Sequence, residues 1–108
     1  MKRTNSMKYT PSFEARELTL YAENTATLYR SRIVPVVNNL ARYYSKGTFD
    51  KEKAVDAFYP VACDAARMYC REFARVEDAP SVFSVTDRFT AAVDLLDGFM
   101  EDIENGGL

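Results

Sequence analysis

Apolar side chains recur every three or four residues between Val55 and Phe73, and this is the most regular pattern in the chain. Such spacing places the side chains on one face of an α-helix, whereas a half-buried strand would alternate apolar and polar residues. Similar patterns occupy residues 18–37 and 89–103, and the only competing extended segment is the short stretch 81–86. The sequence therefore predicts an all-α fold, a small helical bundle of three long helices plus one short helix.

Capping and breaking residues indicate where the first two helices begin and end. Thr10-Pro11 predicts the first N-terminus, since threonine caps a helix and proline fits its first position. Pro35 disfavours helical angles at the preceding residue, so we expect the first helix to end near Arg32 and a second to start at Pro35. One kinked helix is the alternative. The second helix should stop at Lys46-Gly47, where glycine suits the left-handed position.

The last two helices have similar signals. Asp50 is the expected cap of the third helix, and Pro60 predicts a bend within it. A loop is expected over residues 75–83, and Ser84 with Asp87 approximates a capping box that opens the last helix. The expected buried faces of the four helices include the following side chains: Leu18, Val37, Leu40, Tyr44, Val55, Phe58, Ala62, Ala65, Phe73, Phe89, Ala92, Leu96, Phe99 and Ile103.

The 108 residues form one block of composition, which indicates a single helical domain over residues 10–108 after a basic arm, residues 1–9, expected to be mobile. The longest uncharged stretch, residues 33–41, is far shorter than the roughly 20 apolar residues of a membrane span. Cys63 and Cys70 lie about 10 Å apart along one predicted helix, too far for a disulfide. We therefore expect an intracellular protein with no membrane anchor.

The chain contains no histidine, which removes the usual general base and the commonest transition-metal ligand. It also lacks a glycine-rich phosphate loop. We expect no enzymatic activity, no metal and no cofactor. The remaining catalytic alternative is Asp94, Asp97 and Glu101, whose spacing on the last helix would let the carboxylates share Mg²⁺. The simpler interpretation is a solvated face opposite the apolar stripe.

Charge is distributed unevenly along the chain. Residues 1–54 contain ten Lys and Arg against five Asp and Glu, whereas residues 55–108 contain four against eleven. Basic residues near several aromatic rings suit single-stranded nucleic acid, although ordinary surface charges are the simpler interpretation. The nucleic-acid candidates are Arg30, Arg32, Arg42 and Lys46.

Tyrosine is abundant, with seven residues, and this side chain is enriched in protein interfaces. In the adjacent pairs Tyr43-Tyr44 and Phe58-Tyr59, both rings cannot point inward. One ring of each pair is therefore available to a partner or packs at the edge of the core. Together with the acidic last helix, this defines the protein-binding candidates: Tyr43, Tyr44, Tyr59, Asp94, Asp97 and Glu101.

Three parts of the chain resemble a group of small uncharacterised proteins of bacteriophages and other bacterial mobile elements. They are residues 17–24, the turn from Lys46 to Asp50 with the following Lys53-Ala54-Val55, and residues 69–73. The resemblance covers roughly residues 14–104, and Pro60 departs from the pattern. It implies a helical fold and a bacterial cytoplasmic setting, with no catalytic residues to transfer.

These observations favour a non-enzymatic protein-binding module that occupies a surface on a host or phage protein complex, such as an inhibitor of host defence. The dipolar charge distribution suits oriented docking. The alternative is a nucleic-acid-associated accessory protein that uses the basic N-terminal half. A monomer and a homodimer are equally expected.

Overall fold

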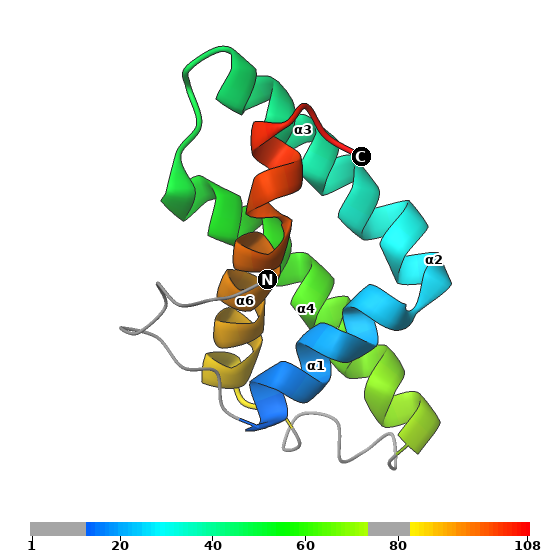
Figure 1. The fold of residues 1–108 in the computed structure, drawn as a ribbon. Helices are drawn as coiled ribbons and strands as arrows, with labels where there is room; N and C mark the ends of the chain where they lie inside the picture. Colours follow the sequence, from blue (N-terminus) through cyan, green and yellow to red (C-terminus); the bar gives the residue numbers. More distant parts are fainter. Residues whose placement is uncertain (1–12, 74–82) are drawn as a thin grey trace.

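The computed structural model describes residues 13–73 and 83–108 (Figure 1). Every regular element in these two ranges is a helix, which confirms the all-α prediction. The predicted arm of residues 1–9, the helix start at Thr10-Pro11 and all but the last residue of the predicted loop 75–83 lie outside the described residues. The elements in chain order are α1 (Phe13–Asn24), α2 (Ala26–Leu28), the π-helical turn η2 (Tyr29–Ile33), α3 (Val34–Ser45), α4 (Lys51–Phe73) and α6 (Val85–Glu104).

Helix α6 is the centre of the packing, because it contacts α4, α1 and α3 (Figure 1). The buried core runs along these contacts and joins side chains from all four long stretches of helix. Fully buried alanines on α1, α4 and α6 let the helix backbones approach closely: Ala15, Ala22, Ala54, Ala62, Ala65, Ala91 and Ala92. In the described part of the chain, no helix combines the length and the apolar character needed to cross a membrane.

The predicted signals around the α3–α4 turn are confirmed. Gly47 has φ of 76°, and its N–H donates to the carbonyl of Tyr44 at 3.1 Å, while the Thr48 N–H donates to that of Tyr43 at 2.9 Å. This pair of hydrogen bonds is the Schellman motif, which uses the last free carbonyls of a helix. The Asp50 carboxylate then accepts the Glu52 N–H at 3.0 Å and caps α4.

The start of α6 also follows its sequence signal. The Ser84 hydroxyl accepts the Asp87 N–H at 2.9 Å, and the Asp87 carboxylate accepts the Ser84 N–H at 3.1 Å, which completes the capping box. At the other end, Gly107 has φ of 106°, and a side chain there would collide with Asn38. The Asn38 amide oxygen accepts the Leu108 N–H at 2.7 Å, which ties the C-terminal end to α3.

The predicted boundary at Pro35 is wrong. The helix breaks ten residues earlier, at Thr25, which is extended with φ of −95° and ψ of 107°. From Ala26 the chain stays helical through Pro35. The Val34 N–H donates to the carbonyl of Tyr29, five residues back, so η2 is one wider turn directly before the proline. A wider turn relieves the clash between a proline ring and the preceding turn, which is why helical angles survive here.

Three expected buried rings are exposed, and these predictions are wrong: Tyr44 is 41% exposed, Phe73 62% and Phe89 50%. Each lies near one end of its helix, where the helical period continues but the neighbouring helices in the described ranges leave much of the ring exposed. The other residues named above as buried are buried or half-buried in the structure. Helix α4 continues through Pro60, as expected.

Candidate functional site

An open groove of about 600 Å³ lies between α1 and the C-terminal half of α4. Figure 1 shows α1 crossing this half of α4. We call this groove the acidic aromatic groove. Its lining combines aromatic and aliphatic side chains with two carboxylates and neutral polar groups: Glu17, Leu20, Tyr21, Asn24, Thr25, Tyr69, Glu72 and Phe73. Among these described lining residues none is basic. The groove therefore offers apolar surface with a negative rim.

The floor of the groove is a cluster of three rings. The Tyr21 ring lies edge-on to Tyr69 with centroids 5.4 Å apart, and Phe73 lies 5.0 Å from Tyr69 and 6.1 Å from Tyr21. Beneath them, the buried Phe83 meets Tyr69 at 5.2 Å. The edge-on pairs Tyr21–Tyr69, Tyr21–Phe73 and Tyr69–Phe83 are each stabilised by about 0.5–1.5 kcal/mol beyond simple burial. The floor is thus anchored to the core while Phe73 remains exposed.

Two reciprocal hydrogen bonds join α1 and α4 across the groove. The Tyr21 hydroxyl donates to Glu72 Oε1 at 2.8 Å, and the Tyr69 hydroxyl donates to Glu17 Oε2 at 3.2 Å. Desolvation and the neighbouring Glu72 raise the pKa of Tyr21, and desolvation and Glu17 raise the pKa of Tyr69. Both effects disfavour the phenolate form, so the neutral rings keep the helices joined.

These raised pKa values predict a loss of stability at alkaline pH. A group whose pKa rises on folding stabilises the folded state fully below its unfolded pKa, about 10 for tyrosine, and this contribution is lost as the pH rises through the folded pKa. We expect the free energy of unfolding to fall above about pH 10, and to fall less steeply in a Tyr21→Phe/Tyr69→Phe variant. Urea unfolding at a series of pH values measures both slopes.

The matched control for this experiment is Tyr43→Phe/Tyr44→Phe, which removes two exposed hydroxyls and leaves the groove intact. It should keep the wild-type slope. If the free energy of unfolding of Tyr21→Phe/Tyr69→Phe fell with pH as steeply as that of the wild type, the two glutamate-linked hydroxyls would not contribute to the alkaline loss of stability.

A second pocket, of about 280 Å³, lies between the α2–η2 segment and α4. We call it the arginine pocket. It is lined by Thr27, Leu28, Ser31, Arg32, Asp64, Arg67, Met68 and Arg71. Of the four nucleic-acid candidates that the sequence indicated, only Arg32 lines this pocket. Its other two arginines come from α4 and were not among the candidates.

The remaining nucleic-acid candidates are exposed at other places. Arg42 donates to the Asn39 side chain at 2.7 Å and lines a separate pocket beside Pro35 and Ala57. Lys46 caps the C-terminus of α3, and Arg30 lies in η2 outside the lining of the arginine pocket. The structure therefore spreads these four residues along α2–α3.

The tyrosine candidates separate into two environments. Tyr43 and Tyr44 are both exposed on the last turn of α3, where Tyr44 packs edge-on against Phe49 at 5.7 Å. Tyr59 is half-buried against the core, and its hydrogen bond with Arg88 is the main cause of the raised pKa of that guanidinium. Tyr43 and Tyr44 are thus accessible, whereas Tyr59 joins α4 to α6.

The predicted solvated face of α6 is wrong at Asp94. Asp97 and Glu101 are exposed, but Asp94 is fully buried, with its Oδ2 atom 3.8 Å from Arg16 Nη1 on α1. The reason is the central place of α6: it packs against three other helices, so its buried face is wider than the apolar stripe. The three carboxylates therefore do not form one exposed cluster.

The residues of the acidic aromatic groove carry only a weak sequence signal. Glu17 and Tyr21 are four residues apart on α1, and Tyr69 and Phe73 are four apart on α4. Such pairs share one face of a helix, but only the crossing of the two helices brings an acid of one beside a phenol of the other.

Among the described residues, no three His, Cys, Asp or Glu side chains are grouped as ligands for a metal ion. Cys63 and Cys70 both lie on α4, as expected, and both are free thiols.

No protein-family model matches the chain, and neither a curated protein nor a solved structure matches it.

Proposed function

We propose that the chain is a non-enzymatic protein-binding module whose acidic aromatic groove takes a basic amphipathic segment of a partner protein. The observation that carries the proposal is the exposed apolar surface inside the groove. Leu20 is 46% exposed and Phe73 is 62% exposed, and both line a hollow whose floor is fixed by ring packing. Large apolar side chains that stay exposed in a preformed hollow are typical of interaction sites.

Charge selects the partner. Glu17 and Glu72 lie in the lining, and the described lining contains no cation to neutralise them. An entering segment with Lys or Arg beside its apolar anchors would satisfy both carboxylates, whereas an acidic segment would be repelled. The groove between two crossing helices also suits a helical ligand with anchors at three- and four-residue spacing.

The resemblance to phage and mobile-element proteins extends this proposal to a partner in a host or phage complex, a defence complex among them, inside the bacterial cytoplasm. The exposed Tyr43, Tyr44, Asp97 and Glu101 would then contact other parts of a whole partner protein, beyond the segment that enters the groove. Monomer and homodimer both remain compatible with this use of the groove.

Selection from a displayed random-peptide library tests the proposal. Peptides selected by the wild-type protein should be rich in Lys and Arg with apolar residues at helical spacing. A selected peptide should bind Glu17→Gln/Glu72→Gln about tenfold more weakly at low salt, because two exposed charge contacts are lost. Leu20→Ala/Phe73→Ala should reduce binding further. Fluorescence anisotropy measures each affinity.

The matched control is Tyr43→Ala/Tyr44→Ala, which removes two exposed rings outside the groove and should leave binding of the selected peptide unchanged. Selection of acidic or unpatterned peptides, or equal affinity for the wild type and both groove variants, would refute the groove as the binding site.

The alternative, a nucleic-acid-associated protein, has weaker support because its four candidate residues are dispersed. It predicts salt-dependent binding of single-stranded DNA or RNA. A gel shift at low salt with Arg42→Ala/Lys46→Ala as the variant tests it. The absence of any shift for the wild type would exclude it.

A further inference from the structure

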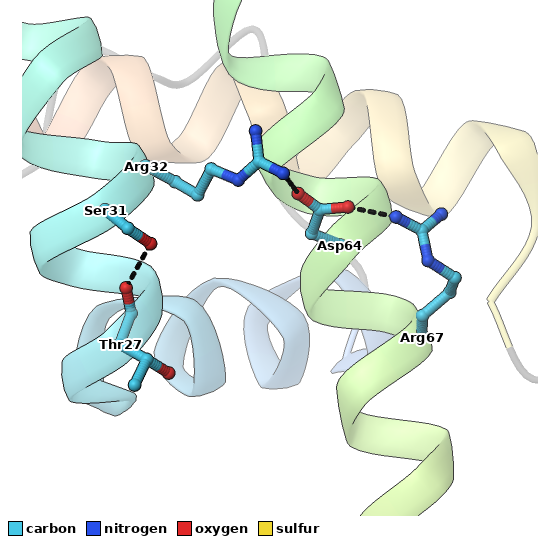
Figure 2. Close-up of polar contacts among 5 residues, drawn as sticks. All are labelled: Thr27, Ser31, Arg32, Asp64 and Arg67. Carbon is cyan, nitrogen blue, oxygen red and sulfur yellow. Dashed lines mark hydrogen bonds and ion pairs between the residues drawn. The ribbon is translucent and has the colours of Figure 1, made fainter.

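The arginine pocket concentrates positive charge around one carboxylate. Arg32 of η2 and Arg67 of α4 both contact the carboxylate of Asp64, one oxygen each. The Arg32 Nη2 atom lies 2.9 Å from Asp64 Oδ2. Figure 2 shows the two guanidinium groups on opposite sides of this carboxylate. Asp64 therefore holds two cations from different helices in one place.

These guanidinium groups keep donors for a further ligand. A guanidinium has five N–H donors, and the Asp64 contacts occupy few of them. The Arg32 and Arg67 side chains are 54% and 61% exposed, whereas Asp64 is 15% exposed. The carboxylate is thus covered while the cations face solvent.

Arg71 adds a third positive charge to the same pocket. It lies one turn beyond Arg67 on α4, and within the described residues it makes no ion pair. Three guanidinium groups against one carboxylate leave a net charge of +2 among the lining residues. A pocket with this surplus attracts an anion of matching charge.

The chemistry of the lining identifies the anion. Arginine binds phosphate oxygens through paired N–H donors. The described lining has no aromatic ring on which a nucleobase could stack. The Ser31 hydroxyl donates to the Thr27 carbonyl at 2.5 Å, which holds this turn of the segment together beside the arginines (Figure 2). The pocket thus offers charge and donors for a compact anion and no surface for a base.

We infer that the arginine pocket binds a dianionic phosphate group, as inorganic phosphate or as a phosphate monoester, through Arg32, Arg67 and Arg71. Asp64 positions the first two guanidinium groups and also repels the ligand, so that only an anion of higher charge than a carboxylate is held. This site lies apart from the acidic aromatic groove and shares no lining residue with it. The inference goes beyond the proposed function and does not depend on it.

Isothermal titration calorimetry of the full chain tests the inference with four ligands at equal ionic strength: inorganic phosphate, phosphoserine, dimethyl phosphate and a short single-stranded DNA. Inorganic phosphate and phosphoserine should bind, and dimethyl phosphate, with a single charge, should bind about tenfold more weakly or not at all. Tighter binding of inorganic phosphate indicates a free anion as the natural ligand, and tighter binding of phosphoserine indicates a phosphorylated partner.

Three variants locate the site. Arg71→Gln should weaken phosphate binding at least about tenfold, because a charge-assisted hydrogen bond to phosphate is lost. It removes no described ion pair, so the fold should be kept. Asp64→Asn should tighten phosphate binding, because the competing negative charge is removed. Arg30→Gln removes an exposed arginine of the same segment that lies outside the pocket lining, and it should bind as the wild type does.

The inference would be overturned if all four ligands bound equally, or if the single-stranded DNA bound while inorganic phosphate and phosphoserine did not. An equal loss of phosphate affinity in Arg30→Gln and Arg71→Gln would also overturn it. The absence of phosphate binding by the wild type would do the same.

Discussion

Replacing Phe58 by alanine should destabilise the protein by about 3–5 kcal/mol, the usual cost of removing a buried aromatic ring from a core. Phe58 is fully buried on α4, and its ring stacks on Phe99 of α6 with centroids 6.4 Å apart and an angle of 16° between the planes. Among the described helices, these two have the most extensive contact. Urea unfolding followed by circular dichroism measures the loss.

The control for this prediction is Phe89→Ala on α6. Phe89 is 50% exposed, so its removal should change the free energy of unfolding by no more than about 0.5 kcal/mol. Where Phe58→Ala is too unstable to measure, Phe58→Leu should show a smaller loss of the same sign. Similar losses in Phe58→Ala and Phe89→Ala would contradict the assigned core.

Replacing Arg16 by alanine should destabilise the protein by about 2–3 kcal/mol. Its guanidinium forms an ion pair with the fully buried carboxylate of Asp94, 3.8 Å away. Removing one partner of a fully buried pair costs about 3–5 kcal/mol. The Arg16 side chain is 46% exposed, so solvent already reaches it and we expect a smaller loss.

A double-mutant cycle separates this charge effect from lost packing. Asp94→Asn keeps the shape of the side chain and removes its charge. In the Arg16→Ala background it should therefore recover part of the lost stability. Arg30→Ala, an exposed arginine without an ion pair among the described residues, should leave the stability within about 0.5 kcal/mol of wild type. No recovery in the double variant would show that the buried charge is not the cause.

The helix ends around Gly47 and Ser84 could be predicted because their hydrogen bonds join residues at most five positions apart. The Thr48 to Tyr43 bond and the reciprocal Ser84 and Asp87 bonds depend on local chain geometry and on side chains present in the sequence. Such motifs have the same physical basis wherever they occur.

The boundary near Pro35 could not be predicted by the same local reasoning. The residue before a proline disfavours helical angles, and this preference is real but weak enough to be overcome. Ile33 and Val37, on either side of Pro35, are fully buried in the core. Burial of both apolar side chains, together with the wider turn η2, keeps the helix continuous, while the chain breaks at Thr25 instead.

Neither pocket could be assembled from the sequence, because each combines residues far apart in the chain. Tyr21 forms a hydrogen bond with Glu72, 51 positions away in the chain, and Arg32 of η2 forms an ion pair with Asp64 of α4. The candidates that the sequence indicated were neighbours in the chain, such as Tyr43 and Tyr44, and the structure leaves that pair outside the groove and the arginine pocket.

The sequence by itself determined the helical class, most of the core and three of the helix ends, since apolar period and capping hydrogen bonds are local properties of the chain. Only the tertiary structure decided that Asp94 is buried and that Phe73 and Phe89 are exposed. It also decided that glutamates face tyrosines in the acidic aromatic groove and that arginines face an aspartate in the arginine pocket. Each of these depends on which helix covers a given face and where that helix ends. Contacts between distant segments determine which faces are covered, and the periodicity of a single helix contains no information about its neighbours.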